Sequence, residues 1–236
     1  MADEAFEVFL NVGGFGPPIP GKSVPQAAFE KYAGVLPAAL LRIWAEFGWA
    51  GFGDGRFWLT DPDEWSIAFE EWFGGVDLPL QDRFHVIARD AFGNFDCWGE
   101  RTGPSLNVGV VDGELFVGDD STRVQARGAD WSLNMWLLGH SPDRIDVYRN
   151  DETPVFADAR RVLGQLTYDE VYGFFPPVAL SGGPENSDIH KVGAIVQLSI
   201  LSQLAPNPLT VHTFGPITIT QPPPPATGPG HGGSES

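Results

Sequence analysis

The sequence predicts an α+β fold in which helices flank a mostly antiparallel sheet and the C-terminal part is helical. Three observations predict it: helical patterns in residues 25–73, short β-rich segments separated by turns in residues 84–117, and helical patterns again after residue 130. The chain has 236 residues, 42% of them hydrophobic, which is enough for a buried core.

Residues 25–48 predict two helices. Phe29 and Tyr32 share a face of the first, and Leu36-Pro37 begins the second. The second helix ends at Gly48, a residue suited to the position after a helix, and its apolar positions are Leu40, Leu41, Trp44 and Phe47. The residues GFGDGRFWL that follow predict a turn leading into a strand.

Asp61 and Pro62 predict the start of a third helix, with Asp61 as N-cap and Pro62 in the first turn. Its apolar face carries Trp65, Phe69, Trp72 and Phe73. Its opposite face carries Asp63, Glu64, Glu70 and Glu71. We therefore expect its tryptophans, like Trp44 of the preceding helix, to be structural.

Four β-rich segments follow, at residues 84–88, 95–98, 108–111 and 114–117. Asp112-Gly113 between the last two predicts a tight hairpin. Helical patterns then return at residues 131–138 and 155–163, and Thr167-x-x-Glu170 has the form of a capping box.

A final long helix is expected from Asn186 or Ser187 to about Leu204, with Ile189, Val192, Val196 and Ile200 facing inward. The Pro- and Gly-rich residues 206–236 are expected to form a largely disordered tail. Within them, residues 209–220 alternate enough to add an edge strand.

The formal net charge is -17, and acidic residues outnumber basic ones in both halves of the chain. Such a surface repels nucleic acid and anionic lipid and attracts basic partners, although solubility alone also accounts for it. The single cysteine, Cys97, excludes an intrachain disulfide. The acidic N-terminus is unlike a signal peptide and no long apolar run exists, so we expect a cytoplasmic protein without a membrane partner.

Residues 16–23 match the P-loop pattern G-x4-G-K-S. A P-loop holds phosphate with successive backbone N–H groups, but Pro17, Pro18 and Pro20 have none to offer. A nucleotide-binding enzyme is therefore kept only as an alternative. A regulatory binding module unrelated to any toxin is a second one.

The remaining candidates for chemistry are isolated. The histidines are scattered, and Asp90 and Asp96 are explained by the turn between them. We therefore expect no enzymatic activity, no cofactor and no metal. The acidic face of Asp63, Glu64, Glu70 and Glu71 is the main candidate for binding a partner, and Asp119 with Asp120 is a second; the alternative for both is an ordinary solvated surface.

Two segments resemble known families. VPQAAFEKYAGVLPAALLRIWAEFGWAGFGDGRFWLTDPDEW and HVIARDAFGNFDCWGE resemble the GAD-like domain. LGQLTYDEVYGFFPPVALSGGPENSDIHKVGAIVQLSILSQLA resembles the C-terminal domain that follows it in type VI secretion immunity proteins. The matching features are Leu-x-x-Asp-Glu-x-Tyr-Gly-Phe from Leu166 to Phe174, Ala179-Leu180, Gly182-Gly183 and the closing helix.

This resemblance implies a GAD-like domain at residues 1–105, an immunity-protein C-terminal domain at 106–205 and a tail at 206–236. From the residues alone, two separate domains and two intimately packed halves remain equally open. The resemblance also implies a cognate effector toxin, commonly a DNase, that is inhibited by direct binding in the cytoplasm. It supplies no catalytic residues.

Overall fold

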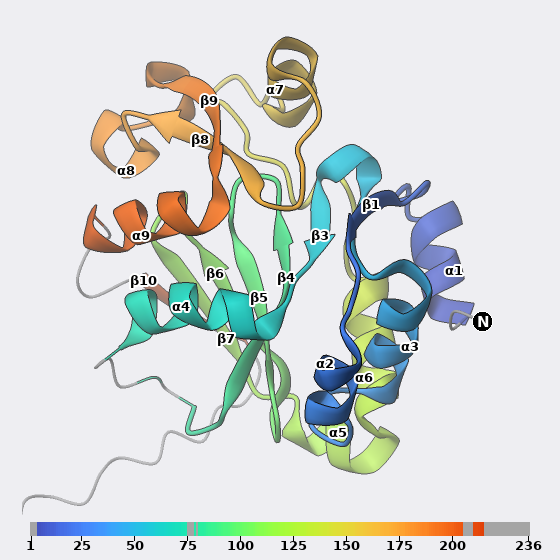
Figure 1. Ribbon diagram of the computed structural model, residues 1–236. Helices are drawn as coiled ribbons and strands as arrows, with labels where there is room; N and C mark the ends of the chain where they lie inside the picture. The colour runs from blue at the N-terminus through green and yellow to red at the C-terminus, as the bar shows by residue number, and fades with distance from the viewer. Residues whose placement is uncertain (1–3, 75–77, 79, 205–209, 215–236) are drawn as a thin grey trace, which may run out of the picture.

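The computed structural model describes residues 4–74, 78, 80–204 and 210–214 (Figure 1). In this part of the chain, eight strands form one sheet in the order β1-β2-β3-β4-β5-β6-β7-β10. All neighbours in it are antiparallel except β10, which runs parallel to β7. The strands are β1 (Ile19–Lys22), β2 (Trp49–Phe52), β3 (Phe57–Leu59), β4 (Phe84–Asp90), β5 (Phe95–Gly99), β6 (Gly103–Gly109), β7 (Glu114–Gly118) and β10 (Thr210–Phe214).

A second, two-stranded sheet and several helices complete the described fold. The small sheet pairs β8 (Glu170–Phe175) with β9 (Asp188–Gly193). The helices are α1 (Glu4–Asn11), α2 (Gln26–Tyr32), α3 (Ala38–Phe47), α4 (Pro62–Phe73), α5 (Ser121–Arg127), α6 (Ala129–Leu138), α7 (Phe156–Leu163), α8 (Val178–Ser181) and α9 (Ala194–Leu204), with short 3-10 turns η1 (Gly53–Gly55) and η2 (Pro184–Asn186). The predicted α+β fold with a mostly antiparallel sheet is confirmed.

Helices cover both faces of the large sheet. Successive side chains of a strand point to opposite faces, and β3 shows this directly. Phe57 contacts Trp136 of α6, with ring centroids 5.9 Å apart, whereas the next residue, Trp58, contacts Tyr168 in the segment before β8, at 6.4 Å. Figure 1 shows α1, α2, α3, α5 and α6 gathered on one side of the sheet and α4 and α9 on the other.

The elements predicted from local signals are confirmed. They are α2, α3, α4, α6 and α7, the strands β4, β5 and β7, and the turn before β3. The strand predicted at residues 108–111 overlaps only the end of β6, which begins at Gly103. Asp61 caps α4 by accepting a hydrogen bond from the Asp63 N–H at 3.0 Å. Gly113 has a φ of 70° in the loop that joins β6 to β7, a left-handed conformation that favours glycine.

The expected long helix from residue 186 to 204 is wrong. Its first part is β9, which pairs with β8, and α9 begins only at Ala194. Val196 and Ile200 were expected to face inward, but both are exposed. The buried positions of α9 are instead Ala194, Gln197, Leu198 and Leu201.

The capping box at residues 167–170 forms its hydrogen bond without beginning a helix. The Thr167 N–H donates to the Glu170 carboxylate at 2.9 Å, as a capping box requires. The Glu170 N–H in turn donates to the Thr167 carbonyl at 3.2 Å, which closes a turn, and strand β8 follows. The side-chain contact is therefore confirmed, and the helix expected after it is wrong.

The core is rich in aromatic side chains. Trp44, Trp65 and Trp72 are all buried, which confirms the structural role predicted for them. Cys97 is buried, and His85 is nearly so, with its Nε2 3.0 Å from a Glu100 carboxylate oxygen.

The Asp90 carboxylate organises the turn between β4 and β5. It accepts hydrogen bonds from the N–H groups of Phe92 and Asn94 at 2.8 and 3.0 Å, and from the Asn94 side chain at 2.7 Å. This confirms the prediction that Asp90 serves a turn. Asp96 accepts a hydrogen bond from the Asn107 side chain at 3.1 Å.

One buried arginine joins the large sheet to the segment before β8. Arg89 of β4 is 1% exposed and donates hydrogen bonds to the carbonyls of Tyr168, at 2.7 Å, and Thr167, at 3.4 Å. A third bond, at 3.0 Å, goes to the Asp90 carbonyl. Burial lowers the pKa of Arg89 to about 10, which leaves the guanidinium charged at neutral pH.

The C-terminal end of the described chain lies at the edge of the large sheet. The edge strand expected within residues 209–220 is confirmed for Thr210–Phe214, which forms β10. The rest of the segment predicted to be disordered, 206–209 and 215–236, lies outside the described residues. The division of the chain near residue 105 stays a prediction.

His140, after α6, is placed to make stability depend on pH. Its ring packs against Trp136, with centroids 4.7 Å apart, and its Nε2 lies 3.7 Å from an Asp96 carboxylate oxygen. Burial alone would lower the pKa of His140, but Asp96 and the Trp136 carbonyl outweigh it, so this pKa is raised above its ordinary value of 6.5. The resulting stabilisation is fully present below about pH 6.5 and is lost as the pH rises through the raised pKa.

Asp96→Asn is therefore expected to weaken this pH dependence. The free energy of unfolding, measured by urea titration at pH 6 and pH 9, should fall less between the two conditions in the variant than in the wild type. Asn keeps the oxygen that accepts from Asn107, and all other groups titrate in both proteins, so the difference isolates His140. An equal fall in both proteins would contradict the assignment.

Candidate partner-binding site

Helix α4 turns the predicted acidic face outward because its other face is fixed in the core. Trp65, Ala68 and Trp72 are buried. Their spacing leaves Asp63, Glu64, Glu70 and Glu71 on the opposite side of the helix, where Asp63, Glu70 and Glu71 are exposed and Glu64 is half-buried. The structure thus brings four of the predicted partner-binding residues together on one helix.

The two acidic residues at the start of α4 already have cationic partners within the chain. Lys31 of α2 forms an ion pair with Asp63, and the Tyr32 hydroxyl donates to the same carboxylate at 2.7 Å. Burial alone would raise the pKa of Asp63, but these two hydrogen bonds outweigh it and lower the pKa. Asp63 is therefore held in the charged form and serves to attach α2 to α4.

Glu64 shares a lysine with a residue of the C-terminal half. The Lys22 ammonium of β1 lies 3.0 Å from Glu64 and 2.7 Å from Asp169, and it lies 4.4 Å from the centre of the Tyr168 ring. Burial alone would lower the pKa of Lys22, but the two carboxylates outweigh it and raise the pKa. One cation thus joins β1, α4 and the segment before β8.

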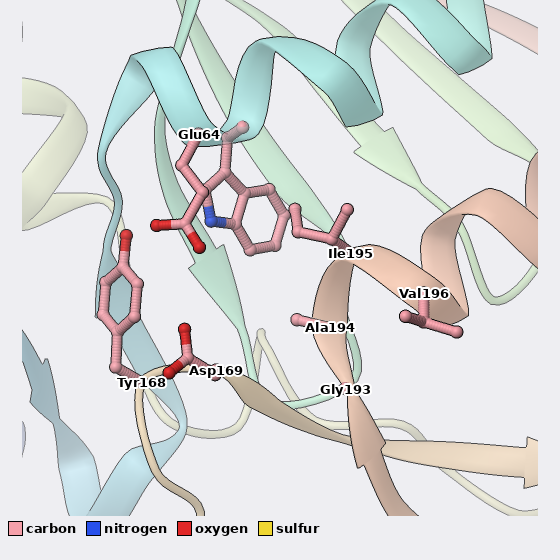
Figure 2. Close-up of a pocket in the computed structure, with 8 residues that line it drawn as sticks. Glu64, Tyr168, Asp169, Gly193, Ala194, Ile195 and Val196 are labelled. Carbon is pink, nitrogen blue, oxygen red and sulfur yellow. The ribbon is translucent and has the colours of Figure 1, made fainter.

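A hollow of about 180 Å³ lies beside this cation, between α4 and the start of α9. Figure 2 shows the carboxylates of Glu64 and Asp169 pointing into the same space, with the Tyr168 ring beside them. Ala194, Ile195 and Val196 form the apolar side of the hollow. Its walls therefore come from both halves of the chain.

Glu70 and Glu71, at the other end of α4, differ from Asp63 and Glu64. In the described part of the chain, Glu71 accepts a hydrogen bond from the Ser199 hydroxyl of α9 at 3.0 Å, and neither residue forms an ion pair. Glu70 also borders a larger hollow of about 620 Å³ on the α2 side of α4, with Lys31, Tyr32 and Asp63. These two carboxylates are the part of the predicted face whose charge the described chain leaves uncompensated.

The second predicted pair, Asp119 and Asp120, lies elsewhere. Asp119 accepts a hydrogen bond from the Ser121 N–H at 2.9 Å, and Asp120 forms an ion pair with Arg123 at 2.8 Å. Both interactions belong to the start of α5. Figure 1 shows α5 at the foot of the molecule, away from α4, so the pair Asp119 and Asp120 does not form one surface with the four acidic residues of α4.

The residues of the P-loop pattern do not form a phosphate-binding loop. Ile19–Lys22 is strand β1, which pairs with β2, whereas a P-loop leads from a strand into a helix. A Cβ at Gly21 would lie 1.9 Å from the Trp49 carbonyl oxygen, so close strand pairing explains this glycine. Lys22, which the pattern assigns to phosphate, is held by Glu64 and Asp169.

Within residues 4–74, 78, 80–204 and 210–214, no group of three or more His, Cys, Asp or Glu side chains could hold a metal ion. Over the same residues, none of the helices has both the length and the apolar character needed to cross a membrane. The site consists instead of an acidic helix face with a hollow on each side of it.

Sequence reasoning missed Tyr168 and Asp169 as members of this site. Both fall within the stretch from Leu166 to Phe174, which was noted only for its family resemblance. The exposed apolar residues of α9 were missed because they were expected to face inward. No local signal places either set beside α4, since the contacts join residues more than 100 positions apart.

The fold and the site define an α+β protein with an acidic helix face at the junction of its two halves. Residues 4–112 match the family of the GAD-like domain, and residues 141–205 match the C-terminal family of the T6SS immunity protein Tdi1. The chain thus carries a GAD-like segment followed by a Tdi1-type C-terminal segment, in the order that the resemblance predicts. The Tdi1 match supports a type VI secretion immunity role.

Among solved structures, a similar one is the crystal structure of Atu4351 from Agrobacterium tumefaciens. Its TM-score is 0.72 at 20% sequence identity, over 84% of this chain and 89% of that chain. This likeness shows a shared fold across both halves. A comparison with curated proteins finds no match.

Proposed function

We propose that this protein neutralises a cognate type VI effector toxin, a basic DNase, by binding the surface with which the toxin holds DNA. The contact is made by the acidic face of α4, and binding takes place in the cytoplasm. The protein acts by occupying this surface and carries out no reaction of its own.

The observation that carries the proposal is the match of residues 141–205 to the Tdi1 immunity-protein family. The charge of the chain supports the finer part. A protein that binds DNA presents Lys and Arg to the phosphate backbone, so its active surface is basic. A chain with a formal net charge of -17 is attracted to such a surface, and its association is accelerated by long-range electrostatic steering.

The geometry of α4 favours its C-terminal end as the contact. Asp63 and Glu64 are compensated by Lys31 and Lys22, and they contribute less net charge to the outside. Glu70 and Glu71 carry two like charges that no cation of the described chain neutralises, and a basic partner supplies the opposite charge. We therefore assign the main electrostatic contact to this pair.

The double variant Glu70→Lys/Glu71→Lys is expected to associate with the toxin roughly ten-fold more slowly at low salt. The probe is the toxin whose gene adjoins that of this chain, purified with an inactivating substitution in its own active site. Association rates are measured between about 20 and 300 mM salt, where screening weakens steering. The salt dependence should be flatter for the variant than for the wild type.

A matched control is Glu4→Lys/Glu7→Lys on α1. It changes the net charge by the same amount at two exposed positions of α1, which lies away from α4 (Figure 1). Equal slowing in both double variants would show that only the overall charge matters and would remove α4 as the contact. Failure of the wild-type chain to bind this toxin, or to protect cells that express it, would overturn the immunity proposal itself.

A further inference from the structure

Helix α9 exposes an apolar stripe in a strongly acidic protein. Its sequence, AIVQLSILSQL, contains no Asp, Glu, Lys or Arg. Val196, Ile200 and Leu204 are 66%, 42% and 39% exposed. They are spaced four residues apart, so they lie along one side of the helix.

The stripe is not what attaches α9 to the fold. The attachment is made by Ala194, Gln197, Leu198 and Leu201, which are buried. The Trp72 indole N–H of α4 also donates to the Leu198 carbonyl at 3.2 Å. Exposed apolar side chains that the core does not use are a common feature of surfaces that bind other proteins.

The stripe adjoins the acidic face of α4. Ser199, between Val196 and Ile200, donates a hydrogen bond to Glu71 at 3.0 Å. Val196 borders the same hollow as Glu64 and Asp169 (Figure 2). On α4 itself, Ile67 is 53% exposed and lies one helical turn from each of the four acidic residues. The apolar stripe of α9 therefore lies beside the acidic face of α4, which itself carries one exposed apolar side chain.

We infer that the α9 stripe, formed by Val196, Ile200 and Leu204, is the apolar centre of the interface with the effector. The occupant is a basic protein surface that presents apolar side chains to the stripe and Lys or Arg to the acidic face of α4. This inference rests on the proposed function and assigns a second element to it. Protein interfaces commonly combine a desolvated apolar centre, which sets the lifetime of the complex, with a charged rim, which sets the association rate.

Charge complementarity favours this occupant over a second copy of the chain. In a twofold dimer the same patch lies on both sides of the interface. Glu70 and Glu71 of one copy would then approach the acidic faces of the other, in two chains that each carry a formal net charge of -17. A basic partner turns this repulsion into attraction.

The test is the double variant Val196→Ser/Ile200→Ser, with the inactivated toxin of the adjoining gene as the probe. Both side chains are exposed, so the fold should be kept. We expect the dissociation rate to rise roughly ten-fold or more, while the association rate and its salt dependence stay near those of the wild type. This is the opposite pattern to that of the Glu70/Glu71 variant.

The matched control is Val12→Ser/Val162→Ser, which removes two exposed valines, 80% and 69% exposed, from other parts of the surface. It should leave both rates unchanged. If the toxin dissociates from the α9 variant at the wild-type rate, the inference is overturned and the immunity proposal stands. If the wild-type chain does not bind the toxin at all, both are overturned.

Two further measurements distinguish the other occupants. A dimer of the free chain in sedimentation experiments, dispersed by Val196→Ser/Ile200→Ser but not by the control, would assign the stripe to a second copy. A fall in the melting temperature of the free α9 variant well beyond that of the control would show that the chain covers the stripe itself. Either result would overturn the inference.

Discussion

Replacing Trp65 with alanine is expected to lower the free energy of unfolding by about 3–5 kcal/mol. The indole is 1% exposed and lies between α4 and the sheet, with its ring centroid 6.2 Å from that of Phe95 and 5.8 Å from the Arg89 guanidinium. Its removal costs the buried apolar area and leaves a cavity that the surrounding sheet cannot close. Urea or thermal unfolding measures the loss.

Trp131→Ala is the control for this variant. Trp131 is only half-buried on α6, so the same chemical change should cost clearly less there, about 1–2 kcal/mol. A loss below about 1 kcal/mol for Trp65→Ala would contradict the core position of this side chain. Toxin binding by the folded fraction of this variant should also be measured, because Trp65 is one of the buried residues that fix the orientation of α4 and its acidic face.

Arg89→Met is expected to destabilise the protein by a similar amount, about 3–5 kcal/mol. Methionine keeps most of the volume but removes the guanidinium N–H groups that donate to the Thr167, Tyr168 and Asp90 carbonyls. Those acceptors then stay buried without their charged donor. This costs more free energy than the loss of a hydrogen bond at an exposed site, where water can replace the donor. Arg89→Lys should recover only a part, because one ammonium lacks the planar geometry that reaches three carbonyls.

The effect of Arg89→Met should also be local. Arg89 attaches the segment of residues 167–168 to β4, so amide hydrogen exchange should speed up more in β8 and the residues before it than in β5 and β6. Arg42→Met is the control. It removes a solvent-exposed ion pair with Asp130, which contributes at most about 1 kcal/mol. Uniform exchange changes throughout the protein would argue against a specific attachment.

The parts of the fold that the sequence predicts are those whose signals are local. The α4 start is an example: Asp61 caps it and Pro62 occupies its first turn, within two neighbouring residues. The β6–β7 hairpin is another, since Asp112-Gly113 lies between the strands it joins. Such signals do not depend on what the rest of the chain does.

The segment of residues 186–204 shows where this reasoning fails. Ile189, Val192, Val196 and Ile200 are spaced by three and four residues, which matches a helix. The backbone of 188–193 instead pairs with β8, whose strand was not predicted, because Thr167 and Glu170 suggested a helix start there. Both wrong helices have the same cause, because the pairing of β8 with β9 joins distant residues and leaves no local signal. For this reason the sequence predicted neither the small sheet nor the exposed stripe of α9.

The candidate site divides in the same way. The outward position of the four acidic residues of α4 follows from helical spacing alone, and the structure agrees. Their partners do not follow from it, since Lys22 and Lys31 reach α4 from 42 and 32 residues earlier in the chain. The sequence alone therefore gives no reason to distinguish the four carboxylates. In the fold, Asp63 and Glu64 are paired with lysines, whereas Glu70 and Glu71 form no ion pair within the described residues.

Mutational freedom is unevenly distributed along α4. A substitution at Asp63 breaks the ion pair with Lys31 of α2, and one at Glu64 breaks the ion pair with Lys22 of β1. A substitution at Glu71 removes one hydrogen bond, from the Ser199 hydroxyl. Within the described residues, the Glu70 side chain forms no hydrogen bond or ion pair that a substitution would remove. During evolution the C-terminal end of the helix can therefore change its charge pattern at little cost to folding. The N-terminal end meanwhile keeps α4 attached to its neighbouring elements. A surface of this kind can be retargeted to a new partner by a few substitutions without first being rebuilt.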